Sequence, residues 1–262
     1  MENKIQLSKI NFRNENISND FNNKNLSFNG YCINLERRLD RWNYFLKEKP
    51  KELNIERFNA VDGKNFIKFV EKEPLDEFES ILKLHCKENG NITGLEGCFL
   101  SHYRLWKKIA NQENIINENQ LIFVFEDDVQ FSQGFMNRLK ESFKDLDENF
   151  DLIYIGGRSK INFLPSKFDL KNHFYKISNN IFKYKNNLQI KDLQRTTSSY
   201  LISKLGAKKL IEEFKKYSFN HNLLYISPVD RFLNLRHSKL NMGDVFPHIC
   251  WSSSIFLSDI SK

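Results

Sequence analysis

The chain has 262 residues, of which 40% are hydrophobic and 14% aromatic, and this apolar content is enough to build a core and to exclude disorder over the whole length. Its formal net charge of +7 favours an anionic partner without choosing one, and the dispersed Lys and Arg residues are typical of solvated helix faces. The sequence has no arginine-rich arm, zinc-finger spacing or RNA-binding aromatic motif, so a nucleic-acid-binding module is not predicted.

The first predicted elements follow a polar N-terminus. Residues 1–29 are rich in Asn, and we interpret them as an N-terminal extension or an added edge strand before a single domain over residues 30–262. That domain opens with "GYCINL", whose apolar run predicts a strand, and with the amphipathic "ERRLDRWNYFLKE", which predicts a helix. A second strand, "IERFNAVDG", ends in an Asp-Gly turn.

The middle of the chain alternates predicted helices and strands. "GLEGCFLSHYRLWKKIA" has near-helical apolar spacing and predicts a buried helix. Apolar strands are predicted at Leu121 to Phe125 and in "DLIYIGG", with a helix from Gln133 to Lys144 between them. This order indicates an α/β fold whose mostly parallel sheet is flanked by helices on both faces.

The last third begins with a segment without clear periodicity. Residues 158–194 predict loops and a small hairpin. "TTSSYLISKLGAKKLIEEF" then predicts a strand, an N-cap at Ser203 and a helix, and the segments "SPVDRFLNL" and "VFPHICWSSS" complete the chain.

Three adjacent carboxylates, Glu126, Asp127 and Asp128, follow the most apolar of these strands. Ligands of parallel sheets bind outside the carboxyl ends of the strands, and carboxylates crowded there repel one another unless a hard cation neutralises them. The triplet therefore predicts a Mg²⁺ or Mn²⁺ site. On local grounds alone, a solvated turn or a helix N-cap is the competing interpretation.

Further polar residues stand at comparable strand ends. Asn34 and Arg38 follow the first strand and Asp62 the second, where an arginine could bind phosphate oxygens and the aspartate a ribose or base. For Arg37 and Arg41 we favour surface pairing with Glu36 and Asp40 along one helix.

Four more residues have both a functional and a structural interpretation. Ser101 and His102 lie in an apolar helix, where a lone histidine is more often a satisfied core residue than a ligand. Asp230 could cap a helix after Pro228, and His248 could simply be packed.

Eight segments in this order resemble glycosyltransferase family 25, the group that contains bacterial lipooligosaccharide galactosyltransferases and collagen hydroxylysine galactosyltransferases. They cover the chain from Gly30 to about Ile260: "INLERRLDRW", "RFNAVDGK", "GLEGCFLSHYRLW", "FVFEDDV", "DLIYIGG", "TTSSYLISKLGAKKLIE", "PVDRFL" and "SDI".

The resemblance implies a GT-A type fold and inverting transfer of galactose or glucose from a UDP-hexose, with a divalent cation, usually Mn²⁺, at the acidic motif. It makes Asp128 the firmest metal ligand, with Asp127 and a C-terminal His248 as further candidates. Glu126 or Asp127 would contact the donor, together with Asn34, Arg38, Asp62, Ser101 and His102. Asp230, in "PVDRFL", is the expected base.

The expected acceptor is a hydroxyl group of a glycan, a lipooligosaccharide or a hydroxylysine-bearing protein. One alternative is a protein of the same fold that binds nucleotide or glycan without catalysis, although the intact acidic triplet argues against it. The other is a metal-dependent phosphohydrolase, which should carry a second metal cluster that the sequence lacks.

The cysteines and the lengths of the apolar runs indicate the cellular compartment. Four separated cysteines without a CxxC pair predict free thiols in a reducing compartment. The sequence shows no signal-like segment and no apolar run near the roughly 18 residues of a membrane span, so we expect a cytoplasmic protein. Peripheral membrane association and the oligomeric state stay open.

Overall fold

The computed structural model describes residues 26–71, 74–144, 146–157, 174–185, 196–220, 228–236, 239–253 and 255–256. Eight strands within these ranges form one sheet in the order β2-β1-β3-β9-β5-β10-β8-β7. Their bounds are Asn54–Asn59, Leu26–Asn34, Leu121–Glu126, Ser199–Ser203, Leu152–Tyr154, Met242–Val245, Ile181–Tyr184 and Phe174–Lys176, respectively.

The direction of the strands confirms the predicted α/β class. The pairs β1–β2, β1–β3 and β5–β10 are parallel. Strands β9 and β8 are each antiparallel to both neighbours, which leaves six of the eight strands pointing the same way. The carboxyl ends of β1, β2 and β3 therefore meet at one edge.

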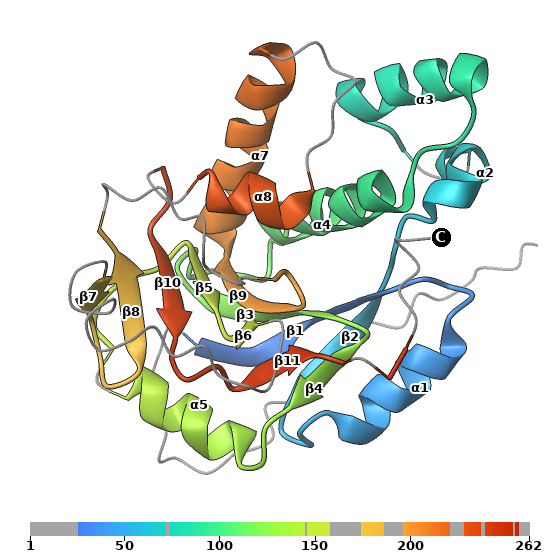
Figure 1. The fold of residues 1–262 in the computed structure, drawn as a ribbon. Coiled ribbons are helices and arrows are strands. Elements are labelled where there is room, and N and C mark those ends of the chain that lie inside the picture. Colours follow the sequence, from blue (N-terminus) through green and yellow to red (C-terminus); the bar gives the residue numbers. More distant parts are fainter. Residues whose placement is uncertain are drawn as a thin grey trace, which may run out of the picture.

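Helices cover both faces of this sheet (Figure 1). On one side lie α1 (Leu39–Glu48) and α5 (Phe135–Phe143). The other side carries α4 (Gly94–Ala110), α7 (Lys204–Asn220) and α8 (Val229–Asn234), with α2 (Phe66–Val70) and α3 (Glu77–Asn89) beyond them and the short 3₁₀ helix η1 (Gly63–Asn65) leading into α2.

Strand β3 shows why its sequence has an unbroken apolar run. Ile122 and Val124 belong to the core under α4 and α7, whereas Phe123 and Phe125 belong to the core over α1 and α5. A strand buried on both faces needs apolar residues at every position, and the acidic triplet begins where this double burial ends.

Helix α4 begins at a capping box. The Thr93 side chain accepts a hydrogen bond from the Glu96 backbone N–H, and the Glu96 carboxylate accepts one from the Thr93 N–H. Close to this end the helix lies against the loop after β2, because Gly97 has no side chain there: a Cβ atom would stand 2.8 Å from the Val61 carbonyl oxygen. This contact fixes the position of α4 over the ends of β1 and β3.

A second, three-stranded sheet extends the edge of the core. It contains β4 (Val129–Phe131), β11 (Cys250–Ser252) and β6 (Gly156–Gly157) in the order β4-β11-β6. The Ser253 backbone N–H donates to the Asp128 carbonyl oxygen at 2.7 Å, so the C-terminal part of the chain supports the acidic turn.

Most predicted elements are confirmed, with shifted bounds. Ser203 caps α7 by accepting the Gly206 N–H at 3.0 Å, as predicted, and β7 with β8 forms the expected hairpin. The prediction overlooked α2 and α3, although Asp76 and Glu79 make a capping box at the start of α3. Residues 1–25, most of 158–194 and the closing "SDI" lie outside the described residues.

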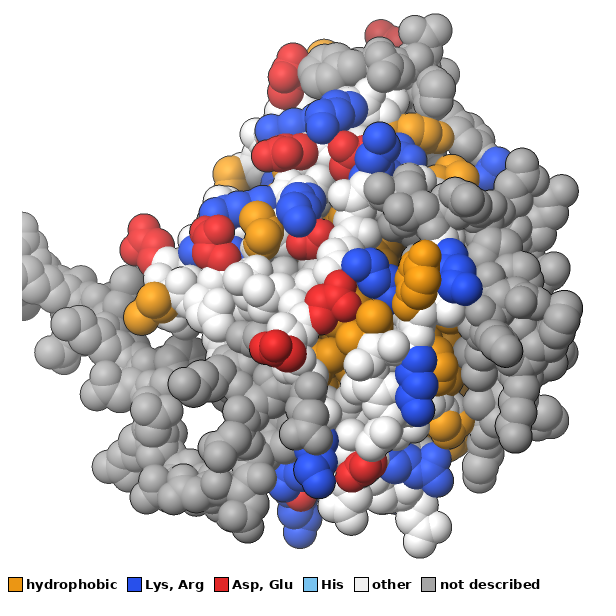
Figure 2. All heavy atoms as spheres, turned by 90° about the vertical axis from the view of Figure 1, so that its left-hand side faces the viewer, with side chains coloured by type: hydrophobic (Ala, Val, Ile, Leu, Met, Phe, Trp, Pro, Cys, Tyr) orange, Lys and Arg blue, Asp and Glu red, His pale blue; other side chains and the backbone are white. Residues whose placement is uncertain are grey.

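The charged side chains are mixed rather than gathered by sign on the face that Figure 2 shows, where Lys and Arg alternate with Asp and Glu. Such mixing fits the interpretation of the basic residues as solvated surface. Across the described ranges, each helix is too short or too polar to span a bilayer.

Gly30 is the most tightly confined position of β1. A Cβ atom there would lie 2.3 Å from the Phe123 carbonyl oxygen of β3. We expect Gly30→Ala to lower the free energy of unfolding by about 1–3 kcal/mol in urea titrations, because the two strands must separate. Asn29→Ala, at the exposed neighbouring position, is the control and should change stability by about 0.5 kcal/mol or less. Equal effects would contradict this account.

Candidate active site

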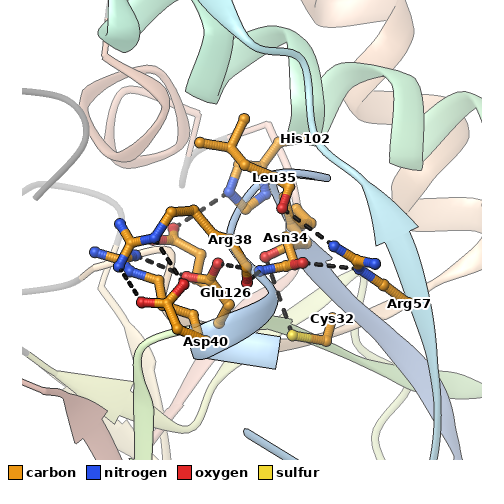
Figure 3. A network of polar contacts seen from close by, with 11 residues as sticks. Cys32, Asn34, Leu35, Arg38, Asp40, Arg57, His102 and Glu126 are labelled. Carbon is orange, nitrogen blue, oxygen red and sulfur yellow. Dashed lines mark hydrogen bonds and ion pairs between the residues drawn. The ribbon is translucent and has the colours of Figure 1, made fainter. Parts of the chain in front are cut away.

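The site lies where parallel strands β1 and β3 end side by side. Ile33 is in register with Glu126, so Asn34 at the end of β1 reaches the turn that carries Asp127 and Asp128. Helix α4 covers this edge from above, and His102 extends from it toward Glu126 (Figure 3). Three separate segments of the sequence thereby contribute polar groups to one place.

Asp127 is buried and fully engaged. Arg41 Nη1 donates to its Oδ1 at 2.8 Å, and Asn34 Nδ2 donates to its Oδ2 at 2.5 Å. Asn34 is itself oriented by Arg57, whose Nε donates to Asn34 Oδ1 at 2.8 Å. Burial raises the pKa of Asp127 despite these partners. Because both carboxylate oxygens are used, Asp127 anchors the acidic turn to β1 and α1.

The surface pairing expected for Arg41 is wrong. Arg41 lies on the buried face of α1 with Phe45, four residues along the helix, and its partner is Asp127. Arg37 pairs instead with Asp62, with Nε 3.1 Å from Oδ2. The physical reason is that Asp127, placed at the end of a buried strand, needs a counter-charge that only an inward-facing residue of α1 can supply.

Glu126 is held by a chain of hydrogen bonds. Thr197 Oγ1 donates to its Oε1 at 2.6 Å, and His102 Nε2 lies 3.3 Å from the same oxygen. His102 Nδ1 lies 2.9 Å from the Tyr200 hydroxyl, which also accepts the Trp106 indole N–H at 3.0 Å. With that donor already supplied, the Tyr200 O–H can donate to Nδ1, which places the imidazole proton on Nε2, toward Glu126.

This chain keeps Glu126 ionised. Burial alone would raise the pKa of Glu126, but the hydrogen bonds from His102 and Thr197 outweigh burial and lower that pKa below its ordinary value. Both hydrogen bonds fall on Oε1, and within the described part of the chain Oε2 has no such partner, so it remains available to a ligand.

Asp128 differs from its two neighbours. Its Oδ1 atom is buried without a hydrogen bond to any described residue. Burial, followed by the negative charges of Glu126 and Asp127, raises the pKa of Asp128 to about 7. A buried carboxylate oxygen without a donor is costly, and a divalent cation would remove that cost. The residues present therefore fit the cation expected at the triplet, and Asp128 Oδ1 is an oxygen that could bind it.

Three predicted donor-binding residues have structural partners. Ser101 Oγ donates to the Gly97 carbonyl oxygen and accepts the Val61 N–H at 2.9 Å, which fastens α4 to the loop after β2. Arg38 makes two hydrogen bonds with Asp40. Asp62 caps η1; burial opposes its ionisation, but hydrogen bonds from Asn65 and Arg37 prevail and lower its pKa.

The two late residues lie in different places. Asp230 is in the first turn of α8, on the side of the sheet that carries α4, from which His102 reaches Glu126. His248 precedes β11, and its ring lies 5.1 Å from that of Phe246. Because Ser252 pairs with Val129 and Cys250 with Phe131, His248 is at the opposite end of this ladder from Asp128. The structure does not bring it to the triplet.

Several residues of the site were missed from the sequence. Phe256 lies 5.4 Å from the Arg41 guanidinium, Thr197 lies in the turn before β9, and Tyr200 lies in β9. A buried position for Arg41 could have been recognised from its spacing to Phe45. The pairing of β9 with β3 has no local signal, so its two contributions could not.

The family model described as glycosyltransferase family 25 (LPS biosynthesis protein) matches residues 27–233. The chain belongs to glycosyltransferase family 25.

Its relatives in this family are longer proteins. Procollagen galactosyltransferase 2 from Mus musculus is 29% identical over 80% of this chain and 30% of its own length. The procollagen lysyl hydroxylase and glycosyltransferase of Acanthamoeba polyphaga mimivirus is 28% identical over 79% and 21%, respectively, and a glycosyltransferase 25 family member from Aedes aegypti is 31% identical over 70% and 28%. The chain spans about a third or less of the length of these curated relatives.

The Arg41–Asp127 pair gives a direct test of the buried anchor. We expect Arg41→Met to lower the free energy of unfolding by roughly 3 kcal/mol, because it leaves Asp127 buried without its counter-ion. Arg37→Met, which removes the more exposed pair with Asp62, should cost no more than about 1 kcal/mol. Urea denaturation of both variants measures the difference, and equal losses would show that Arg41 has no anchoring role.

Proposed function

We propose that this member of family 25 is an inverting glycosyltransferase that moves galactose or glucose from a UDP-sugar to a hydroxyl group. The observation that carries the proposal is the buried Asp128 Oδ1, without a donor among the described residues, beside the ionised Glu126. A site for a nucleotide diphosphate and its cation requires such oxygens, whereas a module that only binds glycans needs no cation to neutralise a leaving group.

The cation proposed at this site is Mn²⁺ or Mg²⁺. When bound, it would neutralise the charge that develops on the diphosphate leaving group. Asp128 Oδ1 and Glu126 Oε2 are the oxygens offered to it. Asp127 contributes by holding the turn through Arg41 and Asn34, and its own oxygens stay engaged.

The proposed base is Asp230. Inversion requires a group that accepts the proton of the acceptor hydroxyl as that hydroxyl attacks from the face opposite the leaving group. Asp230 is half-buried at the start of α8, on the side of the sheet that carries α4 and His102. The Arg231 backbone N–H donates to its Oδ1 at 2.8 Å, which orients the carboxylate.

The acceptor is proposed from chemistry and from the relatives' names. Procollagen galactosyltransferases are among them, and the family description names LPS biosynthesis. A hydroxylysine-bearing protein and a lipooligosaccharide or other glycan are therefore the two acceptor classes to offer the enzyme.

Removal of the proposed metal ligand Asp128 tests the cation site. In the wild-type protein, we expect Mn²⁺ to raise the melting temperature and to support UDP release from a UDP-hexose, both reversed by EDTA. Asp128→Asn should show neither response and lose at least ~10²-fold in rate. Asp147→Asn, the same change at an exposed carboxylate, is the control. Without metal-dependent release from any UDP-sugar in the presence of these acceptors, the enzymatic proposal fails.

Loss of the base should affect turnover alone. We expect Asp230→Asn to bind Mn²⁺ and the UDP-sugar as the wild type does, while its kcat falls ~10²–10⁴-fold. Donor binding is measured by calorimetry and turnover by UDP release. Arg231→Ala, at the exposed next position of α8, should keep full activity. If Asp230→Asn retains the wild-type rate, the base is another residue.

A further inference from the structure

Cys98, His102 and Glu126 form a cluster that the proposed transfer reaction does not use as a unit. Cys98 and His102 are four residues apart and share one face of α4, and Glu126 ends β3 below them. One ligand atom from each residue lies within 4.8 Å of the other two. Within the described ranges, these three residues form a candidate metal-binding group in addition to the acidic turn, and the sequence alone did not reveal it.

The donor set selects a particular class of ion. A thiolate and an imidazole are ligands that Zn²⁺ prefers, whereas Mn²⁺ and Mg²⁺ prefer oxygen. Ligand atoms around tetrahedral zinc are about 3.5 Å apart, as bond lengths of about 2.0–2.3 Å require. The cluster needs to contract by about 1 Å, and the Glu126 side chain, which is 25% exposed, has room to adjust.

The groups behind the cluster are those that a zinc site needs. A ligating histidine usually donates its other N–H to a second group, and the Tyr200 hydroxyl lies 2.9 Å from His102 Nδ1. If the imidazole proton moves from Nε2 to Nδ1, the Nδ1–H donates a hydrogen bond to the Tyr200 hydroxyl oxygen, and Nε2 becomes free to bind the metal. Thr197 continues to hold Glu126 Oε1.

We propose that Cys98, His102 and Glu126 bind Zn²⁺ at a site that shares only Glu126 with the oxygen site at Asp128, with a water molecule as the remaining ligand. The Cys98 S–H proton is released to solvent as the sulfur–zinc bond forms, and His102 only exchanges one tautomer for the other. Zinc withdraws Glu126 from the oxygen site at Asp128, so it inhibits transfer; this consequence alone rests on the proposed function.

The surroundings of Cys98 favour a bound cation. Without one, burial and the charges of Glu126 and Asp230 raise the pKa of the thiol well above its ordinary range, so Cys98 stays protonated and unreactive. A dication reverses this balance, since it attracts the same carboxylates that oppose a free thiolate.

Cobalt spectroscopy of the reduced full chain tests the site without any activity measurement. In buffer without Mg²⁺ or Mn²⁺, which would compete for Glu126, one equivalent of Co²⁺ should give a near-ultraviolet thiolate-to-cobalt charge-transfer band that Zn²⁺ removes. Cys98→Ala should lose the band and weaken Zn²⁺ binding at least ~10-fold, and His102→Gln should weaken it similarly. Cys86→Ala, a buried cysteine of α3, is the matched control and should keep the band.

A wild-type protein without the band, or a Cys98→Ala protein that retains it, overturns the proposal. Calorimetry of the wild type in buffers of different ionisation enthalpy gives a second measurement, independent of any variant's folding: about one proton should be released per Zn²⁺, and none would count against thiolate ligation. A cobalt band in a protein without UDP release would leave the zinc site standing while the proposed function fails. UDP release in a protein without the cobalt band would overturn the zinc site and leave the proposed function standing.

Discussion

The site depends on one electrostatic constraint. Three adjacent carboxylates follow a strand that is buried on both faces, and a single arginine, Arg41, is buried beside them as a counter-charge. Arg41 neutralises Asp127, and the pair lies where water cannot screen it. The other two carboxylates must be stabilised in different ways. Glu126 is ionised because the hydrogen bonds from His102 and Thr197 stabilise one of its oxygens, whereas Asp128 has no donor for its buried Oδ1 among the described residues.

Helix α4 holds the residues around Glu126 in fixed positions. Its capping box sets where it begins, and Gly97 and Ser101 fix it against the loop after β2. His102 then stands over Glu126, and Trp106, one turn further, supplies the hydrogen bond that orients Tyr200. One face of α4 thus packs against the core, and its residues His102 and Trp106 set the position and the ionisation of the Glu126 carboxylate of β3.

Prediction from sequence succeeded where periodicity and burial agree. The apolar run of β3 and the amphipathic spacing of α4 are each specified by local residues, and so their bounds and the place of the acidic turn were found. Prediction failed for Arg41 because the charges of "ERRLDR" also suit a solvated face, and only the spacing to Phe45 points inward. The contributions of Thr197 and Tyr200 depend on β9 pairing antiparallel to β3, a long-range choice that no local pattern encodes.

Glu126 belongs to both proposed cation sites, the oxygen site at Asp128 and the zinc site at Cys98. Its Oε1 is bound on the side of α4 and β9, and its Oε2 is the oxygen left for a ligand at the acidic turn. An ion at Cys98 and an ion at Asp128 would therefore compete for one carboxylate, and two dications so close would repel each other strongly in this buried setting. The Cys98 thiol and the His102 imidazole lie directly behind the acidic turn. A softer metal that binds them would therefore lower the occupancy of the oxygen site, because both sites use the Glu126 carboxylate.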